Sequence, residues 1–249
     1  MKIAAVGSYG VGLTMRVPRM PGAGETLSGG EFASGPGGKG SNQAIGASRL
    51  GASVSLLTAV GDDAFGTAAF DLWREEGVDA AAVAIVPGAS TMVGVIVVEP
   101  SGENRIVIAA GALGHFGADD VERFADVIAA ADLLVVSMEI PEAAVIAALE
   151  AGRRAGVCTL LNPAPARPLP AIAWPLIDVI TPNRGEARIL LALPSADDDG
   201  PAAEVDDALA RRLAAATGGA VVMTLGRHGA IVVDGDSLTR IPPVPVEHV

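Results

Sequence analysis

The sequence predicts an α/β protein built on a doubly wound, mostly parallel sheet. Short apolar, β-branched runs alternate with helical patterns along most of the 249 residues, and this alternation is typical of a parallel sheet covered on both faces. The right-handed crossover rule then places helices on both sides of an open sheet. Ligands bind such sheets at the carboxyl ends of the strands, so the residues that follow each strand are the first candidates for a site.

The elements follow in order along the chain. Apolar, β-branched runs predict strands, and helices are predicted where an apolar period lies between a capping residue and a glycine. The predicted strands are 1–7, 54–60, 133–137, 157–161, 179–181 and 220–224, with a strand-like end at 245–249. The predicted helices are 41–50, closed by Gly51; 64–76, capped by Asp63 and ended by Gly77; and 141–155, beginning at Pro141.

Two segments interrupt the alternation, 10–34 and 91–109. The first is rich in Gly and Pro without a helical period, and the second contains a hairpin pattern around Pro-Ser-Gly-Glu-Asn. We expect them to form a small β-sheet lid over a core of residues 1–9, 35–90 and 110–249. Such a lid excludes water from a site, and its edges favour a homodimer. The acidic stretch 195–204 is predicted to be a solvated loop.

Composition excludes several partners. The chain has 17 basic and 29 acidic residues, a formal charge of −12, whereas nucleic acids and anionic membranes are bound by an excess of Lys and Arg. Cys158 is the only cysteine, so an internal disulfide is excluded and a cytoplasmic location is expected. No apolar run approaches the ~20 residues of a membrane helix, and the apolar start is too short for a signal peptide.

A glycine-rich segment precedes the first predicted helix. Gly35, Gly37, Gly38 and Gly40 allow a ligand to approach the backbone, Lys39 adds a cation and Asn42 lies in the first helical turn. The segment is not a Walker A loop, but it matches G-x-G-x-x-G, with Asp62 at about the dinucleotide spacing. A Rossmann-type NAD-binding oxidoreductase is therefore one hypothesis, and a tight turn with a solvated lysine is the structural alternative.

Several motifs in order resemble the PfkB (ribokinase-like) carbohydrate kinases, and the resemblance covers nearly the whole chain. Gly37-Gly-Lys-Gly-Ser-Asn-Gln-Ala44, Arg49-Leu-Gly-Ala52 and Val60-Gly-Asp-Asp-Ala-Phe-Gly66 resemble the first family signature. Pro21-Gly-Ala-Gly-Glu-Thr26 resembles the family's lid. The later motifs are Asn162-Pro-Ala-Pro-Ala166, Thr181-Pro-Asn-Arg-Gly-Glu186 and Thr224-Leu-Gly-Arg-His-Gly229. The resemblance implies transfer of phosphate from ATP to a sugar or nucleoside.

The resemblance also implies site residues. Those that would contact the sugar are Gly38, Lys39, Gly40, Ser41, Asn42 and Glu139. Those that would bind the nucleotide are Asn183, Thr224, Leu225, Gly226, Arg227, His228 and Gly229. Glu186 would hold Mg²⁺, which prefers oxygen ligands, and a monovalent cation is implied for the full-length form. The structural alternatives are a surface acid for Glu139, a helix cap for Asn183 with Glu186, and a hairpin turn for 224–229.

The sequence departs from the family pattern in two places. Gly10 and Gly12 stand where polar residues usually bind sugar hydroxyls in the family. Ribose is therefore in question as the substrate, and another sugar or a nucleoside is an open alternative. The Asp-Thr-x-Gly-Ala-Gly-Asp segment that carries the catalytic Asp would lie beyond Val249. We therefore expect this chain to be truncated and inactive, with a non-catalytic sugar- or nucleotide-binding pseudo-kinase as the alternative.

Overall fold

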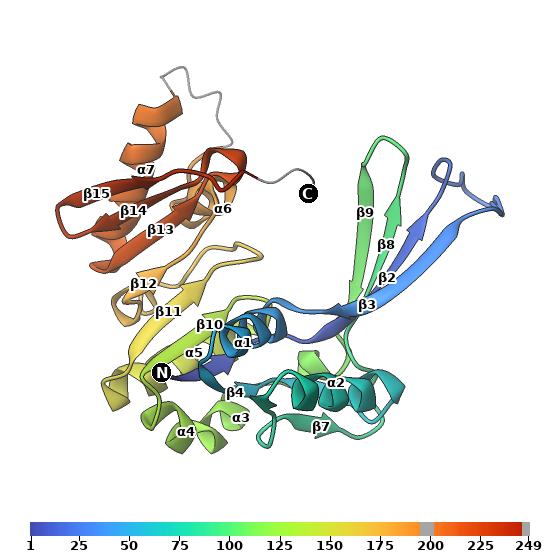
Figure 1. Ribbon diagram of the computed structural model, residues 1–249, viewed down its shortest axis with the longest axis horizontal. Helices are drawn as coiled ribbons and strands as arrows, with labels where there is room; N and C mark the ends of the chain where they lie inside the picture. The colour runs from blue at the N-terminus through green and yellow to red at the C-terminus, as the bar shows by residue number, and fades with distance from the viewer. Residues whose placement is uncertain (195–201, 246–249) are drawn as a thin grey trace.

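A nine-stranded sheet forms the centre of the part of the chain that the structure, a computed structural model, describes: residues 1–194 and 202–245. The sheet is parallel from β6 to β13 and antiparallel at β14 and β15. Its strands in spatial order are β15 (Ser237–Ile241), β14 (Ala230–Asp234), β13 (Ala220–Thr224), β12 (Val179–Ile180), β11 (Cys158–Asn162), β10 (Leu133–Ser137), β1 (Lys2–Val6), β4 (Ser53–Leu57) and β6 (Val78–Asp79). The predicted mostly parallel α/β fold is confirmed (Figure 1).

Helices cover both faces of this sheet because alternate residues of each strand point to opposite sides. Ile3 and Ala5 pack with α1 (Lys39–Arg49) and α2 (Ala64–Glu75), whereas Ala4 and Val6 belong to the core cluster on the other face. That second face is covered by α3 (Ala118–Arg123), α4 (Ala125–Ala129), α5 (Glu142–Ala155), α6 (Arg184–Leu190) and α7 (Ala202–Thr217). The predicted cap of α2 is present, since the Asp63 carboxylate accepts a hydrogen bond from Gly66 N.

A second sheet projects from the main body (Figure 1). It consists of β3 (Glu31–Gly37), β2 (Gly10–Arg16), β8 (Val93–Val98) and β9 (Asn104–Ala109), in that spatial order. We call it the projecting sheet. The prediction of a small β-sheet is confirmed, including the β8–β9 hairpin. Its strands come from the two predicted segments, except that β3 continues through Gly37, beyond the predicted boundary at residue 34.

Two predicted elements are corrected. The single strand expected at 54–60 is interrupted at the buried Thr58, and β5 (Ala59–Gly61) pairs with β7 (Ala84–Val86) instead of continuing in the main sheet. The loop expected at 195–204 falls largely outside the described residues, but 202–204 already belong to α7. Residues 246–249 of the strand-like end also lie outside them.

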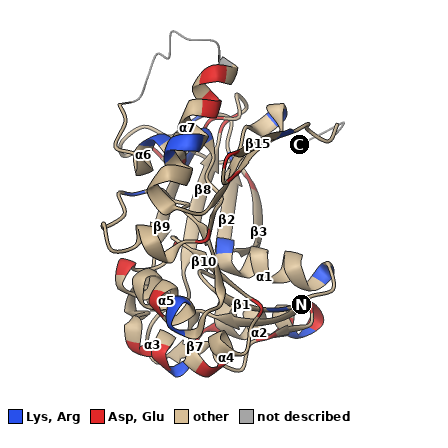
Figure 2. Ribbon diagram, turned by 90° about the vertical axis from the view of Figure 1, so that its left-hand side faces the viewer, with Lys and Arg blue, Asp and Glu red and all other residues tan. Residues whose placement is uncertain are grey.

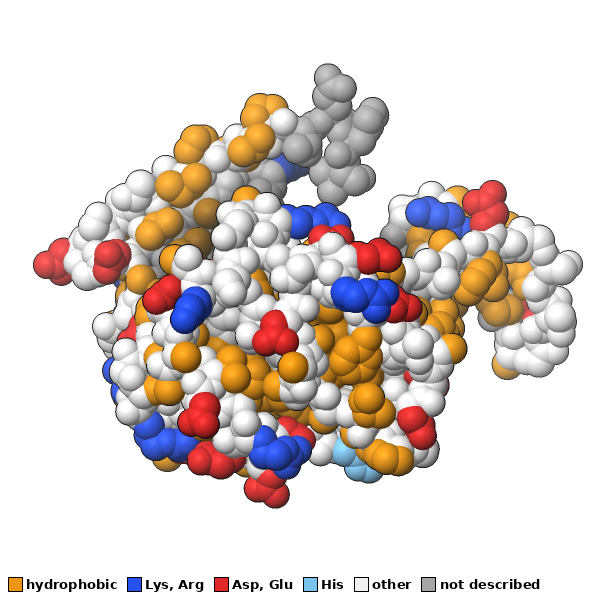
Figure 3. Space-filling model, turned by 60° about the horizontal axis from the view of Figure 1, so that its bottom comes forward, with side chains coloured by type: hydrophobic (Ala, Val, Ile, Leu, Met, Phe, Trp, Pro, Cys, Tyr) orange, Lys and Arg blue, Asp and Glu red, His pale blue; other side chains and the backbone are white. Residues whose placement is uncertain are grey.

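Charged residues are spread over the outer helices, while the strands carry few of them (Figure 2). On the face shown in Figure 3, Lys, Arg, Asp and Glu lie scattered between apolar side chains and do not form a continuous basic patch. In the described ranges, no helix has the length and apolar character needed to cross a membrane.

Candidate functional site

The predicted site residues lie at one edge of the main sheet. Glu139 follows β10, Asn183 follows β12 and Thr224 ends β13, and these parallel strands end at the same edge. The strand β11 separates β10 from β12, so their ends are about 10 Å apart at the usual strand spacing. This edge is where open α/β sheets bind ligands.

A polar cluster of Ser8, Lys39 and Glu139 occupies the β1–β10 side of the edge. One carboxylate oxygen of Glu139, Oε2, accepts hydrogen bonds from the Ser8 hydroxyl at 2.5 Å and from the Lys39 backbone N–H at 2.9 Å. The Lys39 ammonium lies 3.5 Å from the other oxygen, Oε1. The Glu139 side chain is only 17 % exposed and that of Lys39 is 42 % exposed. The cluster therefore holds a fixed carboxylate beside a reachable cation.

Two glycines allow this arrangement. Gly38 has a φ of 90°, and a Cβ there would lie 2.6 Å from Tyr9 Cα. A Cβ on Gly40 would lie 2.6 Å from the backbone of Gly7. The start of α1 can thus lie directly against the end of β1, which brings the Lys39 N–H to Glu139. Gly38 and Gly40 consequently act on the site through backbone packing.

Ser41 and Asn42, both predicted to contact a sugar, face different surroundings. Ser41 is 1 % exposed, and its hydroxyl accepts a hydrogen bond from the Trp73 indole N–H at 2.8 Å in the core. Its own backbone N–H donates to Ser8 O. Both groups of Ser41 are therefore engaged within the protein, and its sugar contact stays a prediction. Asn42 is exposed in the first turns of α1 and remains a candidate.

The predicted nucleotide residues form a second group. Asn183 and Thr224 form an isolated parallel β-bridge, and the backbone N–H of Thr224 donates to Pro182 O at 2.9 Å. The segment 224–229 connects β13 to β14 through a short 3₁₀ turn at Gly226–His228. The backbone of this segment is therefore the hairpin turn named above as the structural alternative. The segment also lies at the edge of the sheet where a ligand-binding loop is expected.

Asn183 and Glu186 form a capping box at the start of α6. The Asn183 side chain accepts from Glu186 N, and Glu186 Oε2 accepts from Asn183 N, each at 2.8 Å. The cap alternative is therefore present in the structure. Among the described residues, no three His, Cys, Asp or Glu side chains form a metal-binding group. A single carboxylate fits Mg²⁺ only where phosphates and water supply the other ligands, so Glu186 would need the phosphates of a bound nucleotide to complete such a site.

Two polar residues at this edge, Ser8 and Asn162, are not among the predicted sugar or nucleotide contacts, although Asn162 opens one of the quoted motifs. Ser8 comes directly after the first strand and reaches Glu139. Asn162 ends β11, between the two groups, and its Oδ1 is buried without a hydrogen-bond partner while Nδ2 lies 3.4 Å from the Thr181 hydroxyl. Both follow directly from the rule that residues at strand ends build the site, so their position in the sequence was the available signal.

The dinucleotide-binding hypothesis does not fit the structure. Gly35 and Gly37 lie inside β3 of the projecting sheet instead of in the turn between the first strand and its helix. Asp62, offered as the ribose-binding acid, accepts a hydrogen bond from Gly88 N at 3.1 Å. The G-x-G-x-x-G match is therefore a coincidence of spacing.

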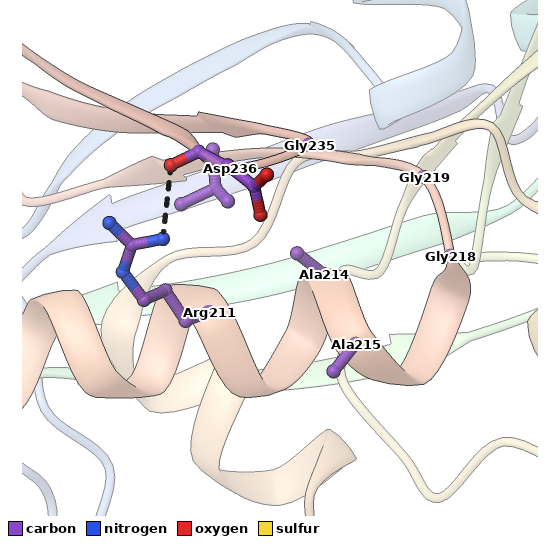
Figure 4. A pocket seen from close by; sticks show the side chains of 8 residues that line it. Arg211, Ala214, Ala215, Gly218, Gly219, Gly235 and Asp236 are labelled. Atoms are coloured by element: carbon purple, nitrogen blue, oxygen red, sulfur yellow. Dashed lines mark hydrogen bonds between the residues drawn. The ribbon is translucent and has the colours of Figure 1, made fainter.

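Two cavities differ in their relation to this edge. A cavity of about 290 Å³ lies beside Glu139 and is lined by Met92, Ile108, Leu113 and Met138, among others. Another, of about 320 Å³, lies between Arg211 of α7 and Asp236, with Gly218 and Gly219 before β13 (Figure 4). The residues before a parallel strand lie at the opposite edge of the sheet, so the second cavity is remote from the polar cluster.

Comparison with known proteins finds similar chains named ribokinase. The chain is 38 % identical over 236 residues to the ribokinase of Schizosaccharomyces pombe, covering 92 % of this chain and 74 % of that protein. It is 37 % identical over 196 residues to the ribokinase of Haemophilus influenzae, covering 79 % and 64 %. The structure of Arabidopsis thaliana ribokinase complexed with ribose and ATP is similar, with a TM-score of 0.85 at 25 % identity over 99 % of this chain and 79 % of that one.

The match to a family profile extends over the entire sequence. Residues 1–249 match the pfkB family carbohydrate kinases. The same residues contain the ordered motifs, and the polar cluster and the 224–229 loop lie at one sheet edge. The chain therefore belongs to the pfkB family of carbohydrate kinases.

Proposed function

We propose that the protein phosphorylates a hydroxyl of a sugar or nucleoside with ATP, in the cytoplasm. The observation that supports this best is the shared sheet edge: a carboxylate and a cation stand on one side of β11, and a backbone loop of the kind that binds phosphates stands on the other. Three strand intervals separate β10 from β13, about 14 Å at the usual spacing, which a sugar and a triphosphate lying end to end would span. Relatives named ribokinase support the same reaction class.

Each group has a distinct part in this proposal. Glu139 accepts hydrogen bonds from substrate hydroxyls, and Lys39 and Asn42 donate to others. The backbone and side chains of 224–229, together with Asn183, bind the phosphates and ribose of ATP. Glu186 binds Mg²⁺, which neutralises charge on the transferring phosphoryl group.

The projecting sheet completes the proposal as a lid. Closing it over Glu139 would remove water from the site before transfer. Its outer strand β9 exposes Ile106, Val107 and Ile108 at 53 %, 72 % and 57 %. Such an apolar edge strand favours pairing with a second copy, so we extend the proposal to a homodimer formed through the projecting sheets.

Calorimetry separates binding from catalysis. The chain should bind ATP in the presence of Mg²⁺ and should bind a sugar or nucleoside, with the second affinity lost in Glu139→Ala. A parallel assay measures ADP release. Binding of both ligands without ADP release would support the pseudo-kinase alternative, and failure to bind any sugar, nucleoside or nucleotide would overturn the proposal.

A further inference from the structure

Three glycines form a row across the base of the projecting sheet. Gly12 on β2 pairs with Gly35 on β3 and with Gly94 on β8, and Gly94 pairs in turn with Ile108 on β9. Residues directly opposite in neighbouring strands present the same face of the sheet. The row Gly35–Gly12–Gly94 is therefore a continuous stretch of bare backbone, bordered by Ile108.

The fold itself does not require glycine at these three positions. None of them has a positive φ. A Cβ at Gly35 would meet no atom within 4 Å, and a Cβ at Gly12 or Gly94 would come no closer than 3.6 or 4.0 Å, which is ordinary contact. Glycine inside a strand weakens it, and it often marks a place where a ligand approaches the backbone closely.

The bare face is on the same side of the projecting sheet as Ile108, which lines the cavity beside Glu139. A Cβ on Gly94 would point at Ile108 Cγ1, and Ile108 lines the 290 Å³ cavity together with Met92 and Glu139. Met92 also fills the space beside Gly10, where a Cβ would lie 2.5 Å from its Cε. Ile108 and Met92 thus connect the glycine row of the projecting sheet with the cavity that Glu139 lines from the main sheet.

The chemistry of this face is apolar and flat. The row and its neighbours Gly10, Met92 and Ile108 offer no polar side chain to a hydroxyl; Thr14, two residues further along β2 on the same face, is the first residue of that strand that does. A hydroxyl buried against the row without a partner would weaken binding. A planar ring fits such a face, because its flat surface can lie on glycine backbone while Met92 and Ile108 pack at its edge.

We propose that the Gly35–Gly12–Gly94 row is the platform for a planar base, and that the substrate is a nucleoside and not a free pentose. The proposal rests on the proposed function, since Glu139 and Lys39 bind the sugar part. In this proposal the bare backbone and Met92 select a nucleoside over free ribose, while Glu139 and Lys39 bind the sugar part that is phosphorylated.

The test compares uridine and inosine with D-ribose by calorimetry, with a non-hydrolysable ATP analogue and Mg²⁺ present to fill the nucleotide site. We expect the better nucleoside to bind about tenfold more tightly than ribose. Gly12→Ala, Gly35→Ala and Gly94→Ala should each reduce nucleoside affinity about fivefold or more by lifting the ring from the backbone. The same variants should unfold at equal or higher denaturant concentration, because alanine is better tolerated in a strand.

Gly46→Ala is the matched control. Gly46 lies in α1, and a Cβ there meets nothing within 4 Å, so this variant should gain stability without loss of nucleoside affinity. Met92→Ser should reduce the ratio of nucleoside affinity to ribose affinity, whereas Met92→Leu should leave that ratio unchanged. Equal or tighter binding of ribose, or full nucleoside affinity in all three row variants, would refute the platform. If Glu139→Ala abolishes ribose binding in the same series, the proposed function survives that refutation.

Discussion

The hydroxyl of Ser8 lies 2.5 Å from Oε2 of Glu139, although the two residues are 131 positions apart in the chain. The parallel pairing of β1 with β10 brings them together, since Ser8 and Glu139 each stand two residues beyond the end of their strand. The same carboxylate oxygen accepts the Lys39 N–H. Glu139 therefore joins the ends of both strands to the start of α1.

Glu139→Ala should weaken sugar or nucleoside binding and also destabilise the fold. The Ser8 hydroxyl and the Lys39 N–H lose their shared acceptor, so the free energy of unfolding should fall by about 1–3 kcal/mol. Urea titration and calorimetry measure the two effects. Glu75→Ala, which changes an exposed glutamate of α2, is the control. Unchanged ligand affinity in Glu139→Ala would remove this residue from the site.

Ser41→Ala should lower stability while leaving ligand affinity within about twofold. The Trp73 indole N–H is buried and donates to Ser41 Oγ, and losing that acceptor costs about 1–3 kcal/mol. Tryptophan fluorescence during denaturation reports on the change, and Ser237→Ala on exposed β15 provides the comparison. A large loss of affinity without loss of stability would contradict this account and support the sugar contact expected from the sequence.

Asp63 should make stability depend on pH in the acid range. Burial raises the pKa of Asp63, but hydrogen bonds from the Thr91 hydroxyl and from the backbone N–H groups of Gly66 and Thr91 lower it more, so the net shift is downward. A carboxyl whose folded pKa is depressed stabilises the fold above its unfolded pKa, and that stability is lost as pH falls through the folded pKa.

The corresponding measurement is the free energy of unfolding of wild type and Asp63→Asn between neutral pH and about pH 3, below the ordinary Asp pKa of about 3.9. The wild type should be the more stable at neutral pH, and the difference should shrink as the medium becomes more acidic. A difference that stays constant over the whole range would show that the Asp63 charge contributes nothing.

Removing Arg184 should cost more than removing an ordinary surface arginine. Its guanidinium donates to both carboxylate oxygens of Asp206, at 2.6 and 2.5 Å, and Asp206 is 3 % exposed. Arg184→Ala leaves that carboxylate buried without this partner, which costs about 3 kcal/mol. Thermal and urea denaturation give the value, and Arg184→Ala combined with Asp206→Leu should recover part of it. A double variant with a lower free energy of unfolding than Arg184→Ala alone would contradict this account.

The sequence predicts local structure well where one residue determines it. Asp63 marks the start of α2, and the alternation of strands and helices indicates the parallel sheet. The break at Thr58 escapes prediction because the run 54–60 is mostly apolar and Thr58 is a β-branched residue of the kind enriched in strands. Gly61 lies against the backbone of Ala89, where a Cβ would be 2.2 Å from the carbonyl oxygen, and that distant segment directs the chain out of the main sheet.

Contacts between distant segments limit what could be predicted of the site. Lys39 and Glu139 follow from motifs, yet the hydroxyl of Ser41 points to Trp73 only because α1 and α2 pack together. The alignment of Gly12, Gly35 and Gly94 depends on strand register across three segments. Neither relationship leaves a local signature in the sequence.

The projecting sheet leaves and rejoins the main body at neighbouring points. Gly10 and Gly37 pair with each other, as do Val93 and Ala109, so each of the two hairpin-like excursions starts and finishes at nearly the same place. Insertions or deletions at their far tips would not alter the spacing of the anchoring ends. Evolution or engineering could therefore lengthen, shorten or transplant these arms between related chains while the remainder of the scaffold stays as it is.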